Sequence, residues 1–194
     1  MSVPYVIEKE KGGQERVYDL YSRLLKDRII FIKGMFNDEM SDAVVAQLLF
    51  LESADPNADI YMYVNSPGGM VTSMYAIFDV MQYIKPDIVT VGMGQCASAA
   101  SFILAAGTKG KRYALPNTEI MIHEFSGGVE GKAQDMFQTL EKQKQLWEKM
   151  AKHYAGFTGQ KVNKIKQDMS RDYYMTAEQA LEYGLIDEIH AKRS

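Results

Sequence analysis

The sequence has a single cysteine, Cys96, among its 194 residues. One cysteine can form neither an intrachain disulfide nor, by itself, a thiolate metal site. No run of 18 or more apolar residues occurs, and charged residues at positions 8–10 interrupt the N-terminal segment before a secretory signal could form. Lys and Arg number 22 against 25 Asp and Glu, so no basic excess favours nucleic acid. We therefore expect a cytoplasmic protein without a membrane or nucleic-acid partner.

Motifs that bind phosphate or metal are missing as well. The chain has no G-K-[ST] sequence, which argues against a P-loop, and no G-x-G-x-x-G follows a predicted strand, which argues against a dinucleotide site. The three histidines lie far apart and no H-E-x-x-H occurs, so no metal site is predicted. We expect the chain to bind no cofactor of its own.

The composition is that of an ordinary globular protein, with 46% hydrophobic and 24% charged residues. At this length a single domain over residues 1–194 is expected. Short apolar strands alternate with helical patterns, which predicts an α/β fold made of parallel βαβ units. Strands are predicted at 28–33, 59–64, 87–93, 111–114 and 119–123, with helices at 38–53, 70–84 and 98–106. A turn is predicted at 65–69, where proline and two glycines follow the second strand.

The second half of the chain carries a long helical pattern. Residues 132–155 would form a helix of roughly 35 Å, with an apolar stripe at spacings of three, four and seven. This stripe could pack along its own domain or against another copy, and the pattern alone leaves both open. A shorter helix at 177–183 is predicted by a capping box at Thr176 and Gln179 and by Gly184 at its end.

Two places could carry chemistry near strand ends. Ser98 lies at a strand-to-helix junction among small residues, where free N–H groups of the helix's first turn could stabilise an oxyanion. The alternative is that Ser98 is a simple helix N-cap. Gly68 and Gly69 could leave an N–H open to a substrate carbonyl, or could merely form a turn.

A base and a carboxylate are also available. His123 ends an apolar strand and could act as a general base, although a structural histidine is more common. Asp172 could orient an imidazole, or could pair with Arg171 at the surface. His153 and His190 are predicted to be solvated. With eleven serines, three histidines and twelve aspartates in the chain, residue type alone selects no triad.

Seven segments carry a further signal, namely residues 21–30, 65–69, 98–107, 114–117, 121–123, 171–172 and 176–187. In their order and spacing these segments resemble the proteolytic subunit of the Clp protease, the ClpP family. The resemblance runs along nearly the whole chain and implies a crotonase-like fold, with a head of repeated βαβ units and a projecting handle helix. It also implies a serine endopeptidase, with Ser98 as nucleophile, His123 as general base and Asp172 as the orienting carboxylate. The oxyanion hole would be formed by the backbone N–H groups of Gly69 and Ala99.

The resemblance further implies an assembly. Family members form two stacked rings of seven subunits around a chamber, fed with unfolded polypeptides by a Clp-family AAA+ unfoldase such as ClpX, ClpA or ClpC, and the unfoldase, not this chain, uses the ATP. Residues 1–20, including 3–7, would form the axial segment, and about 125–157 the handle. Tyr63, Tyr83 and Leu49 fall at positions where the ATPase docks, in pockets at subunit boundaries.

Two departures from the family pattern suggest a divergent paralogue that acts beside another ClpP or has altered substrate preference. Ala99 replaces the usual methionine after the nucleophile, which would change the pocket for the substrate side chain. Glu124 and Phe125 replace Gln-Pro, which would place a carboxylate beside the base and loosen the following strand. The alternatives are a ring subunit of low or no activity that supports an active paralogue, or a crotonase-type acyl-CoA enzyme.

Overall fold

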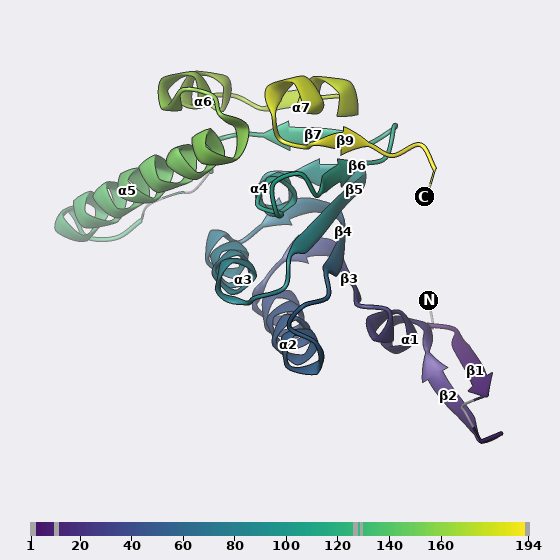
Figure 1. Cartoon of the computed structure of the whole chain (residues 1–194). Coiled ribbons are helices and arrows are strands. Elements are labelled where there is room, and N and C mark those ends of the chain that lie inside the picture. The colour runs from purple at the N-terminus through teal and green to yellow at the C-terminus, as the bar shows by residue number, and fades with distance from the viewer. Residues whose placement is uncertain (1–2, 10–11, 126–127, 129, 193–194) are drawn as a thin grey trace.

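The computed structural model describes residues 3–9, 12–125, 128 and 130–192. Its centre is a seven-stranded sheet in the order β3-β4-β5-β6-β9, with β7 pairing β5 beyond β6 and β8 pairing β7 (Figure 1). The strands are β3 (Ile29–Phe36), β4 (Ile60–Gly69), β5 (Ile88–Ala97), β6 (Arg112–Ala114), β7 (Glu119–Ile122), β8 (Tyr173–Met175) and β9 (Glu188–Ile189). All pairs are parallel except β7 with β8. The predicted α/β fold of parallel βαβ units is confirmed.

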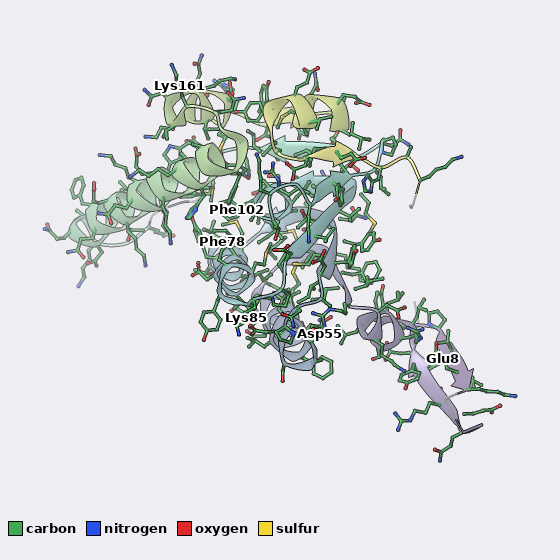
Figure 2. All side chains as sticks on the ribbon, in the orientation of Figure 1. Glu8, Asp55, Phe78, Lys85, Phe102 and Lys161 are labelled. Carbon is green, nitrogen blue, oxygen red and sulfur yellow. The ribbon has the colours of Figure 1, made fainter. Side chains whose placement is uncertain are left out.

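Three helices connect the first parallel strands and cover one face of the sheet. They are α2 (Asp38–Ala54), α3 (Val71–Tyr83) and α4 (Ala99–Ala105). On β4 the alternate residues Ile60, Met62 and Val64 are buried in the core that these helices share. All seven residues of α4 are buried, which accounts for its sequence of small and apolar residues. Figure 2 shows Phe78 of α3 and Phe102 of α4 together in this layer, with ring centroids 5.2 Å apart.

Two strands run further than expected. The segment 65–69 is the end of β4, not a turn, because it has partners on both sides: Gly68 and Gly69 pair with β3, and Ser66 pairs with Cys96 of β5. The positive φ of 99° at Gly68 and 150° at Gly69 lets the chain stay in the sheet through a shift of register. The proline and glycines of this segment favour a turn, but pairing with the strands on both sides keeps the segment in the sheet. β5 likewise continues to Ala97, the residue before Ser98.

The C-terminal half completes the fold with helices α5 (Ala133–Thr158), α6 (Val162–Asp168) and α7 (Ala177–Tyr183). The capping box between Thr176 and Gln179 is present, and Gly184 ends α7 with φ 91°. The long α5 projects from the body of the molecule (Figure 1). Only Met150, Ala151 and Tyr154 of α5 are buried. The apolar stripe therefore packs on its own chain at one end only, and Phe137 and Leu140 lie exposed on the rest.

An N-terminal unit that the sequence patterns did not predict extends from the opposite side. It consists of a two-stranded hairpin, β1 (Tyr5–Lys9) with β2 (Glu15–Asp19), followed by α1 (Leu20–Lys26). Glu8, labelled in Figure 2, contacts Arg23 of α1 and ties the hairpin to that helix. The hairpin has little core of its own, since Tyr5, Ile7 and Val17 are all more than 60% exposed.

One buried ion pair holds the C-terminal half to the sheet. The side chain of Arg112 on β6 is only 1% exposed and forms two hydrogen bonds, of 2.8 and 2.7 Å, with the carboxylate of Asp187 before β9. Arg112 also donates to the carbonyl groups of Ala105 and Phe157, at the ends of α4 and α5. Burial alone would raise the pKa of the Asp187 carboxyl, but the hydrogen bonds and charge of Arg112 hold that pKa below its ordinary value.

Replacing Asp187 by Asn is expected to lower the free energy of unfolding by about 3 kcal/mol at neutral pH, because Arg112 is left buried without a counter-ion. The carboxylate has a lowered pKa, so its contribution is present above pH of about 4 and is lost as the pH falls further. Urea unfolding at neutral and acidic pH measures both effects. The exposed Asp42→Asn serves as control. An Asp187→Asn protein as stable as the control at pH 7 would contradict this account.

Candidate active site

The site forms where the carboxyl ends of three parallel strands meet. Ser66 of β4 pairs with Cys96 of β5, and Ala97 of β5 pairs with Met121 of β7. In parallel strands the next residues stay side by side, so the ends of β4, β5 and β7 deliver three chain segments to one edge of the sheet. Crevices at such carboxyl ends are where open α/β sheets bind ligands.

Ser98 occupies the sharp connection from β5 to α4. Its backbone has φ 56° and ψ −119°, a conformation that costs a non-glycine residue about 1–3 kcal/mol. Ser98 N–H donates to the Met121 carbonyl at 2.9 Å, which anchors this residue to β7. Ser98 stands at the N-cap position of α4, but its side chain makes no capping hydrogen bond. The interpretation of Ser98 as a simple N-cap is therefore wrong, and its hydroxyl is directed elsewhere.

The hydroxyl of Ser98 contacts the imidazole of His123, which in turn contacts the carboxylate of Asp172. Ser98 Oγ lies 2.9 Å from His123 Nε2, and His123 Nδ1 lies 3.1 Å from Asp172 Oδ1. When Nδ1 carries its proton toward Asp172, Nε2 is free to accept the Ser98 hydroxyl proton. His123 is 23% exposed and Asp172 is 56% exposed, so the imidazole is the more enclosed of the two. The structure thus joins three residues that the sequence separates by 25 and 49 positions.

The pairing of β7 with β8 explains how Asp172 reaches His123. These strands are antiparallel, with Ile122 opposite Tyr173. The following pair in this register is His123 and Asp172, just past the ends of both strands. The Glu124 N–H then donates to the Met169 carbonyl at 2.7 Å and closes the pairing. Asp172 is therefore held by strand register toward His123, which replaces the expected alternative of a surface pair with Arg171.

Glycine is required at both positions of the 68–69 pair. A Cβ on Gly68 would lie 2.7 Å from Ser98 Cβ and 2.8 Å from the Ala97 carbonyl oxygen. A Cβ on Gly69 would lie 2.4 Å from the carbonyl oxygen of Phe36. Neither distance is tolerable between real atoms. Gly68 lets β4 pass directly beneath the Ser98 connection, and Gly69 lets β4 lie close against Phe36 of β3, so both roles go beyond an ordinary turn.

A cavity of about 350 Å³ opens beside Ser98 and His123. Most of the residues that line it are apolar, but the exposed surface of the cavity is almost equally polar and apolar. The lining residues are Pro67, Gly69, Met70, Val71, Met74, Ser98, Ala99, Met121, His123, Phe125, Met150 and Tyr154. As the first residue of α4, Ala99 has an N–H with no carbonyl partner four residues back in the helix. Sequence reasoning missed the four methionines and Tyr154, whose only signal was ordinary apolar spacing.

One residue from each departure from the family pattern, Ala99 and Phe125, lies at this cavity. Ala99 is buried in its wall. Phe125 also lines it and packs edge-on against Trp147 of α5, with ring centroids 6.5 Å apart. The side chain of Glu124 is exposed. Ala99 and Phe125 are therefore both placed where a change of side chain would change the shape of the cavity.

The other two histidines are not simply solvated, which corrects the sequence-based expectation. His153 of α5 packs against the rings of Phe78, Phe102 and Phe157. Burial, with the nearby charge of Lys149, lowers the pKa of His153. His190 stacks on Tyr113, with ring centroids 4.0 Å apart. Neither contacts Ser98 in the part of the chain that the structure describes.

The three residues expected to dock an ATPase do not meet within one chain. Tyr63 of β4 lies on the sheet face opposite α2 and α3 and stacks on Phe31 at 5.6 Å. Leu49 on α2 and Tyr83 on α3 are exposed, by 43% and 80%. Tyr63 instead lines a groove of about 530 Å³ that sequence reasoning missed. The groove residues are Asp59, Tyr61, Tyr63, Val89, Val91, Lys111, Tyr113, Leu115, His190, Ala191 and Lys192.

Metal ligands, a reactive cysteine and membrane-spanning helices would be features of other kinds of site. Within the described ranges, no three His, Cys, Asp or Glu side chains cluster so as to hold a metal ion. Cys96 is buried, and this burial raises the pKa of its thiol to about 12, which disfavours the thiolate form that a nucleophile needs. None of the helices in this part of the chain is long and apolar enough to cross a membrane.

Replacing Gly68 by Ala is expected to displace Ser98, since the new methyl group would overlap Ser98 Cβ. The reaction of Ser98 with a fluorophosphonate should slow by roughly 100-fold, because its hydrogen bond to His123 is lost. Gly110→Ala is the matched control, since Gly110 also has a positive φ of 86° but has open space around it. Equal labelling rates in the two variants would show that the close approach does not position Ser98.

The family comparison agrees with this geometry. The sequence model of the family described as Clp protease matches residues 12–193. The parallel sheet, its covering helices and the projecting α5 agree with the ClpP fold that the resemblance implied. Because the match covers nearly the whole sequence, the chain belongs to the Clp protease family and is a ClpP-type peptidase.

Proposed function

We propose that this chain is the serine endopeptidase subunit of an ATP-dependent, chambered cytoplasmic protease that cuts unfolded polypeptides into short peptides. The observation that carries the proposal is the continuous contact from Ser98 Oγ through the His123 imidazole to the Asp172 carboxylate. This arrangement supplies a nucleophile, a general base and a carboxylate that orients the base, in the order that acyl transfer needs.

In the proposed mechanism Ser98 Oγ attacks the scissile carbonyl carbon while His123 Nε2 takes the hydroxyl proton. Asp172 stabilises the resulting imidazolium through Nδ1–H. The N–H groups of Gly69 and Ala99 bind the oxygen that becomes negative. His123 then gives its proton to the leaving amine, and an acyl group remains on Ser98. Water attacks this ester with His123 again as base, which releases the acid and restores the hydroxyl.

The cavity beside Ser98 supports an endopeptidase. Its volume and the apolar side chains among its lining suit an apolar side chain of the residue that precedes the scissile bond. Methionine side chains at Met70, Met74, Met121 and Met150 are flexible and adapt to different apolar groups. Such a pocket favours a broad class of apolar side chains over one sequence.

Replacing Ser98 by Ala is expected to abolish both fluorophosphonate labelling and cleavage of short peptides, with a loss of at least about 10³-fold. Ser53→Ala, which changes an exposed serine of α2, should behave as the unmodified protein. The two variants are compared by mass spectrometry of the labelled protein and by peptide fluorescence. Labelling that persists in Ser98→Ala would remove Ser98 as the nucleophile.

The second candidate, a ring subunit of low or no activity that supports a paralogous ClpP, predicts a different result. Unmodified protein would then assemble but would neither react with the fluorophosphonate nor cut peptides. This would hold for the protein alone and for mixed rings in which the paralogous subunits lack their nucleophilic serine. The presence of all three groups in hydrogen-bonding contact favours the active subunit. An acyl-CoA enzyme is not favoured, since the chain belongs to a peptidase family.

Two surfaces support the proposed assembly of two stacked seven-membered rings. The exposed apolar residues Phe137 and Leu140 on the projecting part of α5 leave a stripe for a second copy to cover. The N-terminal hairpin, with Tyr5 and Ile7 exposed, suits the axial segment of such rings. Enclosure would also protect other proteins of the cell from a peptidase with a broad apolar pocket.

The proposed partner is a Clp-family AAA+ unfoldase such as ClpX, ClpA or ClpC, which would use the ATP. The groove around Tyr63, with apolar Val91 and Leu115, offers a site for an apolar loop of that partner. Tyr83 and Leu49 lie on helices at the other face, so a full docking pocket needs Tyr63 from one subunit and α2 and α3 from its neighbour.

Replacing Tyr83 by Ala is expected to lower degradation of a folded protein by the ATPase complex by roughly 10-fold or more, because aromatic side chains dominate such contacts. Cleavage of short peptides without ATPase should stay unchanged, and native mass spectrometry should show seven or fourteen copies. Leu181→Ala, an exposed apolar residue of α7, is the control. Unaided digestion of folded protein, or an equal effect of both variants, would contradict docking at Tyr83.

A further inference from the structure

The carbonyl group of Ser98 is held by an unusual number of donors. It accepts a hydrogen bond from the Phe102 N–H at 3.2 Å and a second one from Ser101 Oγ at 2.7 Å. The hydroxyl of Tyr154, from the buried end of α5, lies 2.8 Å from Ser101 Oγ and 3.5 Å from the same carbonyl oxygen. Ser101 is fully buried and Tyr154 is 1% exposed, so water does not compete for these contacts.

The directions of these hydrogen bonds can be assigned because the hydroxyl groups of Ser101 and Tyr154 each have one proton to donate. A carbonyl oxygen can only accept, so in its 2.7 Å contact Ser101 Oγ donates its single hydroxyl proton to the Ser98 carbonyl oxygen. Ser101 Oγ can then only accept from Tyr154. Burial raises the pKa of the Tyr154 hydroxyl, which therefore stays protonated and able to donate. The result is a chain of donors from Tyr154 through Ser101 to the Ser98 carbonyl.

This chain acts on the same peptide unit that carries a proposed oxyanion donor. The Ser98 carbonyl and the Ala99 N–H are opposite ends of one planar trans peptide, so fixing the direction of the carbonyl fixes the direction of the N–H. Hydrogen bonds accepted at a carbonyl also polarise the N–H of the same unit. The strained ψ of −119° at Ser98 makes this support necessary, because a relaxed ψ would rotate the Ala99 N–H away.

We propose that Tyr154 is a positioning residue for the oxyanion hole, acting through Ser101 on the Ser98–Ala99 peptide. The inference rests on the proposed peptidase function of Ser98. In this proposal the Tyr154 hydroxyl does not touch the reacting atoms. It also means that the buried end of α5, 53 positions along the chain from Ser101, contributes to the catalytic geometry.

The test replaces Tyr154 by Phe, which keeps the ring in the cavity wall and removes only the hydroxyl. The kcat for a short peptide should fall by roughly 3- to 10-fold, with KM unchanged, because the donor chain serves the transition state more than the bound substrate. The affinity of a peptide boronic acid, whose tetrahedral adduct needs the oxyanion donors, should fall by a similar factor.

A matched control exists in the same layer of the structure. Tyr75 of α3 also packs against Phe102, but within the described residues its buried hydroxyl has no hydrogen-bond partner. Tyr75→Phe should therefore leave kcat, KM and boronate affinity unchanged. Ser101→Ala should lower kcat at least as much as Tyr154→Phe, and the double variant should lose little more than Ser101→Ala alone, since the two hydroxyls act in series.

Native mass and thermal unfolding of each variant separate positioning from assembly. The inference is overturned if Tyr154→Phe equals Tyr75→Phe in kcat, if KM rises while kcat holds, or if the loss tracks dissociation of the rings. Failure of the proposed function looks different, because then the unmodified protein itself would lack a labelled Ser98.

Discussion

The conformation of the single peptide unit between Ser98 and Ala99 is the constraint on which the site depends. A non-glycine residue at φ 56° and ψ −119° persists only when its surroundings determine it fully. Here the N–H of Ser98 is tied to β7, its carbonyl is tied to α4 and α5, and Gly68 lies directly beneath its Cβ. Each tie comes from a different element, so the strain at Ser98 is sustained by the packing of the whole head.

The same packing sets the other two members of the site. β7 carries His123 to the edge of the sheet next to β5, and the antiparallel register of β8 brings Asp172 opposite it. The bidentate pair of Arg112 and Asp187 holds the C-terminal half, which includes β8, against β6. Stability and chemistry are thus linked, since the half of the chain that this ion pair holds to the sheet also supplies Asp172.

The sequence predicted the α/β alternation, the long helix and the capping box at Thr176, because each rests on local pattern. It could not choose Ser98, His123 and Asp172 from residue types alone; the family resemblance did so, and strand register explains why they meet. The turn expected at 65–69 was wrong because pairing with two neighbours overrides local turn propensity. Tyr154 looked like one more apolar position of a helical stripe, since a partner 53 positions away leaves no local signal.

The central claim is that Ser98 attacks a carbonyl whose oxygen is received by backbone N–H groups. A structure of the assembled protein after reaction with a fluorophosphonate tests this most directly. The account predicts a phosphorus–Oγ bond at Ser98, with the phosphoryl oxygen within about 3 Å of the nitrogens of both Gly69 and Ala99. A phosphoryl oxygen turned toward solvent, or an adduct on any other residue, would contradict it.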